Sequence, residues 1–107
     1  MSLDFSLWQR KRVEVESFNI THNLTRMADA AGIYNCLWRP SEHGITKAHQ
    51  MTAPLEAGLK LLKDDPTKYE AYNSPNGWGM YEHFVPFVEK VLAACIANPE
   101  SEVESDV

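Results

Sequence analysis

Two short segments of the chain combine hydrogen-bonding side chains with aromatic rings. The first is Asn19-Ile-Thr-His-Asn23, and the second is Asn76-Gly-Trp-Gly79, which Tyr81 follows closely. Glycine allows a backbone to approach another group closely, and amide, imidazole and indole groups together suit a small planar or anionic ligand. We therefore expect these segments to bind a small polar, nucleotide-like molecule.

A third segment adds a stacking surface and a forked cation. Trp38 and Arg39 are adjacent in the sequence, and a guanidinium group binds anions through paired donors. A single ligand site requires all three segments to converge on one pocket. The expected ligand-binding residues are then Asn19, Thr21, His22, Asn23, Trp38, Arg39, Asn76, Trp78 and Tyr81.

The same residues also have simpler structural explanations. Thr21 is placed to cap a helix that begins at about His22, because its hydroxyl can accept an otherwise unpaired backbone N–H. Asparagine side chains satisfy loop backbone in the same way, and Trp78 could fill the core between its two glycines. Helix capping accounts for much of the polarity of these segments. It does not explain why Asn, His, Trp and Arg side chains are concentrated in three separate segments of one small domain.

Catalytic patterns are weak in this sequence. No pair among the four histidines has the spacing of a helical metal site, and phosphate-loop and nucleophile-elbow motifs are absent. We therefore predict no cofactor, no bound metal and no assigned catalytic residue. The remaining enzymatic alternative is a small hydrolase that uses His22 with Glu82 or Cys36, which requires these groups within hydrogen-bond reach.

The surrounding pattern predicts an α+β fold. Alternation of apolar and polar residues indicates strands around residues 5–7 and over residues 13–20, with a turn near Arg10 and a bulge near Ser17. Helical periodicity follows over residues 22–31, 46–63, 66–72 and 80–97. The expected architecture is three to four helices packed on a small N-terminal antiparallel sheet or hairpin.

Two prolines leave the bounds of the longer helices open. Pro54 and Pro86 each require either a kink or a later helix start, near Thr52 in one case and near Phe84 in the other.

The negative charge of the chain is concentrated at its C-terminus. The net charge is −5, and residues 100–107 hold four acidic residues and no basic one. We expect one globular domain over residues 1–99 and an acidic, flexible tail over residues 100–107, where Val103 could add a short strand.

Charge and hydropathy also exclude classes of partner. The nearly neutral body lacks the basic surface that nucleic-acid binding requires. No apolar run approaches the ~18 residues of a membrane span, and the N-terminus lacks the apolar region of a signal peptide. We expect a cytoplasmic protein with Cys36 and Cys95 as free thiols, and neither nucleic acid nor membrane as a partner.

The motifs together resemble a known family. They are the segment from Asn19 to Leu24, Ala31-Gly32-x-Tyr34, Leu37-Trp38-Arg39-Pro40-x-Glu42, Asn76-Gly-Trp-Gly-x-Tyr81-Glu82 and Phe84-Val85-x-Phe87-Val88. This set, spread over residues 13–97, is similar to a family of small uncharacterised proteins of bacteriophages and bacteria, actinobacteria included. The resemblance implies a recurrent, phage-associated domain and transfers no catalytic residue.

Two functions without catalysis follow from these observations. The first is the binding of a small polar ligand at the three converging segments. The alternative is a protein-interaction module, such as a phage accessory or counter-defence factor, which predicts an exposed aromatic patch around Trp38 or Trp78. The sequence leaves the oligomeric state open, a homodimer included.

Overall fold

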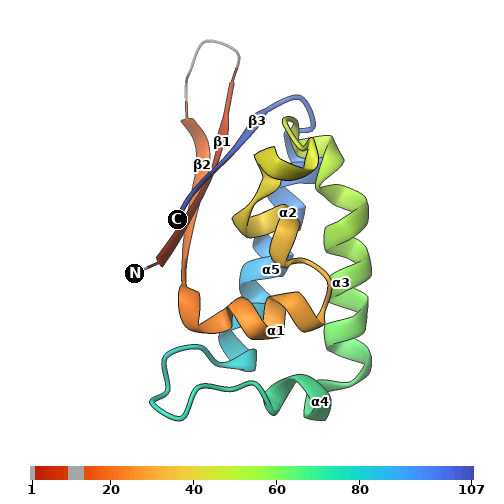
Figure 1. Cartoon of the computed structure of the whole chain (residues 1–107). Helices are drawn as coiled ribbons and strands as arrows, with labels where there is room; N and C mark the ends of the chain where they lie inside the picture. The colour runs from red at the N-terminus through yellow and green to blue at the C-terminus, as the bar shows by residue number, and fades with distance from the viewer. Residues whose placement is uncertain (1, 10–13) are drawn as a thin grey trace.

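Three antiparallel strands form one sheet, seen edge-on in Figure 1. The computed structural model describes residues 2–9 and 14–107, with the side chains of residues 14 and 15 left out. The strands are β1 (Ser2–Trp8), β2 (Glu14–Thr21) and β3 (Glu102–Asp106). Their spatial order is β2-β1-β3, so β1 is central and β2 and β3 are the edges.

The N-terminal hairpin follows the predicted alternation. Leu3, Phe5 and Leu7 are fully buried on one face of β1, because alternate residues of a strand point to the same side. The pairing register with β2 shifts by one residue next to Leu7, which provides the change of face expected near Ser17. The turn predicted near Arg10 lies outside the described residues.

The C-terminal segment is a strand, so the prediction of a flexible acidic tail was wrong. β3 pairs with β1, Val103 packs against the core, and the Ser105 hydroxyl donates to the Leu37 carbonyl at 2.6 Å. Acidic composition predicted solvation of the whole segment. In a strand, however, Val103 and Ser105 share one face while the acidic residues between them point the other way.

Helices cover one face of the sheet (Figure 1). They are α1 (Thr25–Ala30), α2 (Tyr34–Trp38), α3 (Thr52–Asp64), α4 (Pro66–Glu70) and α5 (Tyr81–Ala97), with 3-10 turns η1 (His22–Leu24), η2 (Pro40–His43) and η3 (Ala48–Gln50). The α+β class is therefore confirmed. Among the described helices, none combines the length and the apolar character needed to cross a membrane.

The two long helices, α3 and α5, are each continuous through a proline. α3 begins at Thr52 and takes Pro54 in its first turn, where the missing N–H has no helical partner to lose. α5 begins at Tyr81 and runs through Pro86. Pro86 cannot donate to the carbonyl of Glu82, so α5 lacks one bond of its helical ladder there.

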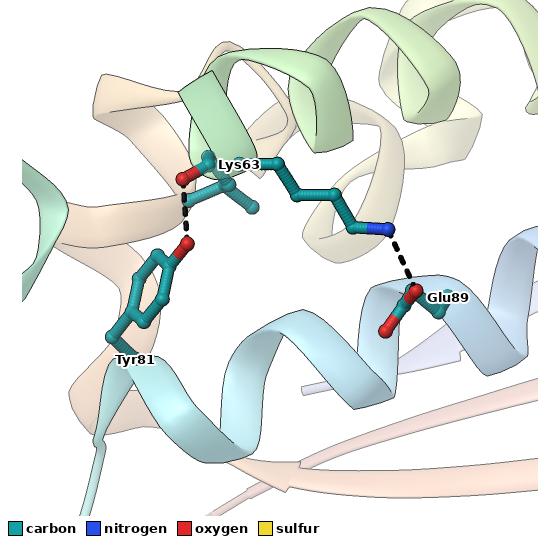
Figure 2. Close-up of polar contacts among 4 residues, drawn as sticks. Lys63, Tyr81 and Glu89 are labelled. Atoms are coloured by element: carbon teal, nitrogen blue, oxygen red, sulfur yellow. Dashed lines mark hydrogen bonds and ion pairs between the residues drawn. The ribbon is translucent and has the colours of Figure 1, made fainter. Parts of the chain in front are cut away.

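The two long helices are joined by two polar contacts at the C-terminal end of α3. The Tyr81 hydroxyl donates to the Leu62 carbonyl at 2.6 Å, and the Lys63 ammonium lies 2.8 Å from a carboxylate oxygen of Glu89 (Figure 2). These contacts set one side of α5 against α3. A second side of the helix, at residues 82, 83, 86, 87 and 90, is left to border β2.

Candidate binding groove

An open groove of about 1070 Å³ follows the outer edge of β2. Residues 17–21 of β2 form one wall, and residues 82–90 of α5 contribute the other. Residues 76–79, from the loop that precedes α5, line the end of the groove where β2 leads into η1. The groove therefore brings together residues of both polar-aromatic segments that the sequence singled out, with the exception of His22, which does not line it.

Asn23 and Gly79 join these two segments directly. The Asn23 side-chain amide donates to the Trp78 carbonyl at 2.6 Å. Gly79 has a φ of 117°, and a Cβ built on it would lie 2.7 Å from the Cβ of Asn23. No other residue type fits this position without displacing one of the two segments.

The loop itself is shaped by two asparagines. The Asn76 side-chain oxygen accepts from the Trp78 backbone N–H at 2.9 Å and from the Ser74 hydroxyl at 2.5 Å. The Asn73 side-chain oxygen accepts from the backbone N–H of Tyr81 at 2.7 Å, at the start of α5. The polarity of Asn76 is therefore largely used to form the turn, as the capping explanation expected.

Trp78 stands in solvent at the end of the groove. Its side chain is 71% exposed, although its backbone carbonyl and N–H are both hydrogen-bonded. Hydrogen bonds thus hold the backbone of Trp78 in place while its indole ring stays exposed to solvent. A single exposed apolar residue is ordinary on a protein surface, but Trp78 shares the groove with Phe18 and Phe87, and contiguous apolar surface of this kind marks interaction sites.

The groove has an apolar floor between β2 and α5. The rings of Phe18 and Phe87 meet edge to face, with their centroids 6.3 Å apart. Phe18 and Ile20 are both half-buried and lie two residues apart on the core face of β2. Pro86 completes the lining from the side of α5.

Charged and titratable side chains on α5 border this floor. Glu82 and His83 are exposed near the loop, and Lys90 is exposed about two turns further along the helix. The described lining therefore carries one acid, one base and one imidazole. Such a rim can orient a partner by charge but does not form a strongly charged site.

Asn19 and Thr21 border the groove while their side chains serve the fold. The Asn19 amide donates across the sheet to the Ser2 hydroxyl at 2.9 Å and to Asp4 at 2.7 Å. The Thr21 hydroxyl accepts from the Asn23 backbone N–H at 3.3 Å, which is the predicted N-cap. Both side chains therefore have a structural role.

The third predicted segment lies away from the groove. Trp38 is 3% exposed, stacks on Tyr34, and donates from its indole nitrogen to Nδ1 of His22 at 2.8 Å. Arg39 lies 3.6 Å from Glu42 on the surface. The expected convergence of three segments is therefore wrong for Trp38 and Arg39. The indole of Trp38 is buried because its large apolar area packs in the core and its one N–H donor finds a partner there.

Tyr81 also has a structural role. Its hydroxyl is taken up by the Leu62 carbonyl of α3 (Figure 2), so the ring points toward α3 and is not part of the groove lining. This contact could not be predicted from local sequence, since Leu62 lies 19 residues away.

The enzymatic alternative gains nothing from the geometry. Burial raises the pKa of the Cys36 thiol to about 12, and its sulfur donates to the Ile33 carbonyl. Nδ1 of His22 accepts from Trp38, while Glu82 borders the groove. Among the described residues, no group of three or more His, Cys, Asp and Glu side chains could hold a metal ion.

Sequence reasoning missed the apolar and charged residues of the groove. These are Phe18, Ile20, His83, Pro86, Phe87 and Lys90. Phe18 and Ile20 were expected only as part of the strand over residues 13–20, and both are half-buried. The available signal was that this strand precedes no other strand in the chain until residue 102, which favours an edge position.

No protein-family model, curated protein or solved structure matches the chain. The resemblance to phage and bacterial proteins therefore remains an expectation from the motifs.

Proposed function

We propose that the chain is a protein-interaction module that binds a segment of a partner protein in the groove beside β2. The observation that carries this proposal is Trp78, an exposed indole held over an apolar groove by a hydrogen-bonded backbone. Tryptophan is among the residues that most often dominate binding energy at protein interfaces.

The composition of the groove supports the same proposal. An apolar centre at Phe18 and Phe87 is bordered by exposed polar and charged groups, which is the usual arrangement of a protein interface. A small-molecule site instead surrounds most of its ligand. With Trp78 largely in solvent and Trp38 and Arg39 elsewhere, the groove favours a partner segment over a nucleotide-like ligand.

A selection experiment tests the proposal. Random linear peptides displayed on phage are selected against the full chain, and the tightest binder is titrated against the wild type and Trp78→Ala. We expect the substitution to weaken binding by at least about tenfold, as for a central interface tryptophan. The free energy of unfolding should change by less than about 0.5 kcal/mol, since the ring is exposed and the backbone bond to Asn23 is retained.

Leu61→Ala is the matched control. Leu61 is also a large exposed apolar residue, at 48%, but it lies on α3 and does not line the groove. Binding should survive this change. Equal affinity of the Trp78→Ala and Leu61→Ala variants, or a selection without binders, would contradict the proposed function.

A further inference from the structure

β2 is the edge of the sheet on the side of the groove. The strand order is β2-β1-β3, so among the described strands β2 pairs with β1 alone. In an antiparallel strand, alternate residues turn their N–H and C=O groups away from the neighbouring strand. Along residues 17–21 these groups are therefore directed toward the space beside the sheet, which the groove occupies.

The part of this edge that lines the groove, residues 17–21, lacks the usual protection against further pairing, whereas Glu14 and Glu16 lie at the start of β2. Edge strands are commonly guarded by charged side chains, by proline or by a covering segment. Residues 17–21 contain no charged residue and no proline. The opposite edge differs, because β3 carries Glu102, Glu104 and Asp106 and its start is joined to residues 46 and 47.

The helical layer provides a floor for one more strand. Helix α5 lines the groove beside β2 through residues such as His83, Pro86 and Lys90. Phe18 and Ile20 share the core face of β2 yet remain half-buried. A fourth strand at this edge would lie over α5 and complete the burial of both side chains.

We infer that the occupant of the groove is an extended peptide segment that adds to β2 as a fourth strand. This inference rests on the proposed function and specifies its partner. Main-chain hydrogen bonds to residues 17–21 would supply register and affinity, while alternate side chains of the peptide enter the groove. At ~3.3 Å per residue, these five positions accept a strand of about five residues.

The lining defines the chemistry of that segment. Side chains two residues apart face the apolar floor at Phe18 and Phe87 and are themselves apolar. The end beside Trp78 suits a ring or a methyl group that packs on the indole. The end beside Lys90 suits an acidic side chain.

A second copy of the chain fits this edge less well than a peptide. Pairing β2 with β2 of another copy would bring a second α5 to the same edge. Both helices would then compete for the space under the joined strands, which each α5 already borders. A separate strand carries no helix of its own and meets no such conflict.

The decisive experiment methylates the backbone of the peptide. Each amide nitrogen of the tightest selected peptide is methylated in turn, which removes one donor and leaves every side chain unchanged. Loss of a strand-pairing bond should weaken binding by about tenfold. We expect this loss at every second position and less than about threefold loss at the positions between, where the donor faces solvent.

Amide exchange of the full chain, followed by NMR, supplies the matching observation on the protein. Binding of the unmethylated peptide should slow exchange at every second amide of residues 17–21, since the intervening amides already pair with β1. A peptide that depends on Trp78 but shows no alternation in either measurement would refute strand addition and leave the proposed function intact. A stable dimer with protected β2 amides in the absence of peptide would assign the edge to a second copy and overturn the inference.

Discussion

Single residues decide where the polar-aromatic segments meet and what they expose. Asn23 and Gly79 hold strand and loop together, Asn76 closes the turn, and Trp78 is left in solvent. The sequence identified all of these positions as a group. It could not divide them into structural and exposed residues, because the pairing of Asn23 with Trp78 joins positions 55 residues apart in the chain.

The closeness of Gly79 to Asn23 predicts an unequal effect of two similar substitutions. Gly79→Ala must adopt a φ of 117° and place its Cβ 2.7 Å from Asn23, whereas Gly77→Ala adopts a φ of 79° in open space. We expect Gly77→Ala to lower the free energy of unfolding by about 1 kcal/mol and Gly79→Ala by at least about 2 kcal/mol. Urea denaturation measures both, and equal losses would show that the contact with Asn23 is unimportant.

The two buried cysteines predict a loss of stability at alkaline pH. Burial raises the pKa of both thiols from 9.0 to about 12, so the folded state retains protons that the unfolded chain releases. Their contribution to stability is complete below pH 9 and is lost progressively as the pH rises toward 12.

Urea denaturation across this range checks the cysteine prediction. The comparison is between the wild type and the Cys36→Ala/Cys95→Ala variant, which shares every tyrosine and lysine and so cancels their titration. The wild type should lose more stability than the variant as the pH is raised from about 8 to about 10.5. Parallel profiles for the two proteins would contradict the prediction.

At the scale of elements, α3 depends on one glycine for its approach to the turn between α1 and α2. A Cβ at Gly58 would lie 2.2 Å from the Cγ2 of Ile33. Alanine stabilises a free helix by up to about 1 kcal/mol relative to glycine, but overpacking here costs about 1–3 kcal/mol. We therefore expect Gly58→Ala to be destabilising in the wild type.

Removal of the opposing side chain tests that explanation. In an Ile33→Ala background the contact with Cγ2 is gone and the carbonyl oxygen of Ala31 remains 3.2 Å from the added Cβ. Gly58→Ala should therefore cost clearly less free energy of unfolding than in the wild type when both pairs are compared by urea denaturation. If Gly58→Ala costs the same free energy in both backgrounds, the contact with Ile33 does not set the position of α3.

The predicted elements succeeded where the signal was local. Alternation located β1 and β2, and the apolar stripe with Thr21 located η1 and α1. β3 was missed as an ordered element because its acidic residues dominate the local composition, while its order comes from pairing with β1 at the other end of the chain. Long-range pairing of this kind leaves little trace in a short stretch of sequence.

At the scale of the whole molecule, the groove forms because the sheet stops at its edge strand β2 while α5 of the helical layer borders the space beside that edge. α5 is fixed to α3 through Tyr81 and Lys63 (Figure 2), and its other side borders the exposed edge of β2. The α+β class was predictable from periodicity. The groove was not, because it depends on which strand lies at the edge and on how far α5 reaches beside it.

The indole N–H signals of the tryptophans test the central claim most directly. Trp78 lines the groove and is exposed, whereas the Trp38 indole is buried, is bonded to His22 and does not line the groove. In a ¹H–¹⁵N spectrum of the full chain titrated with the selected peptide, we expect the Trp78 indole signal to shift and the Trp38 signal to stay in place. A shift of the Trp38 signal with an unchanged Trp78 signal would place the binding surface elsewhere and contradict the account.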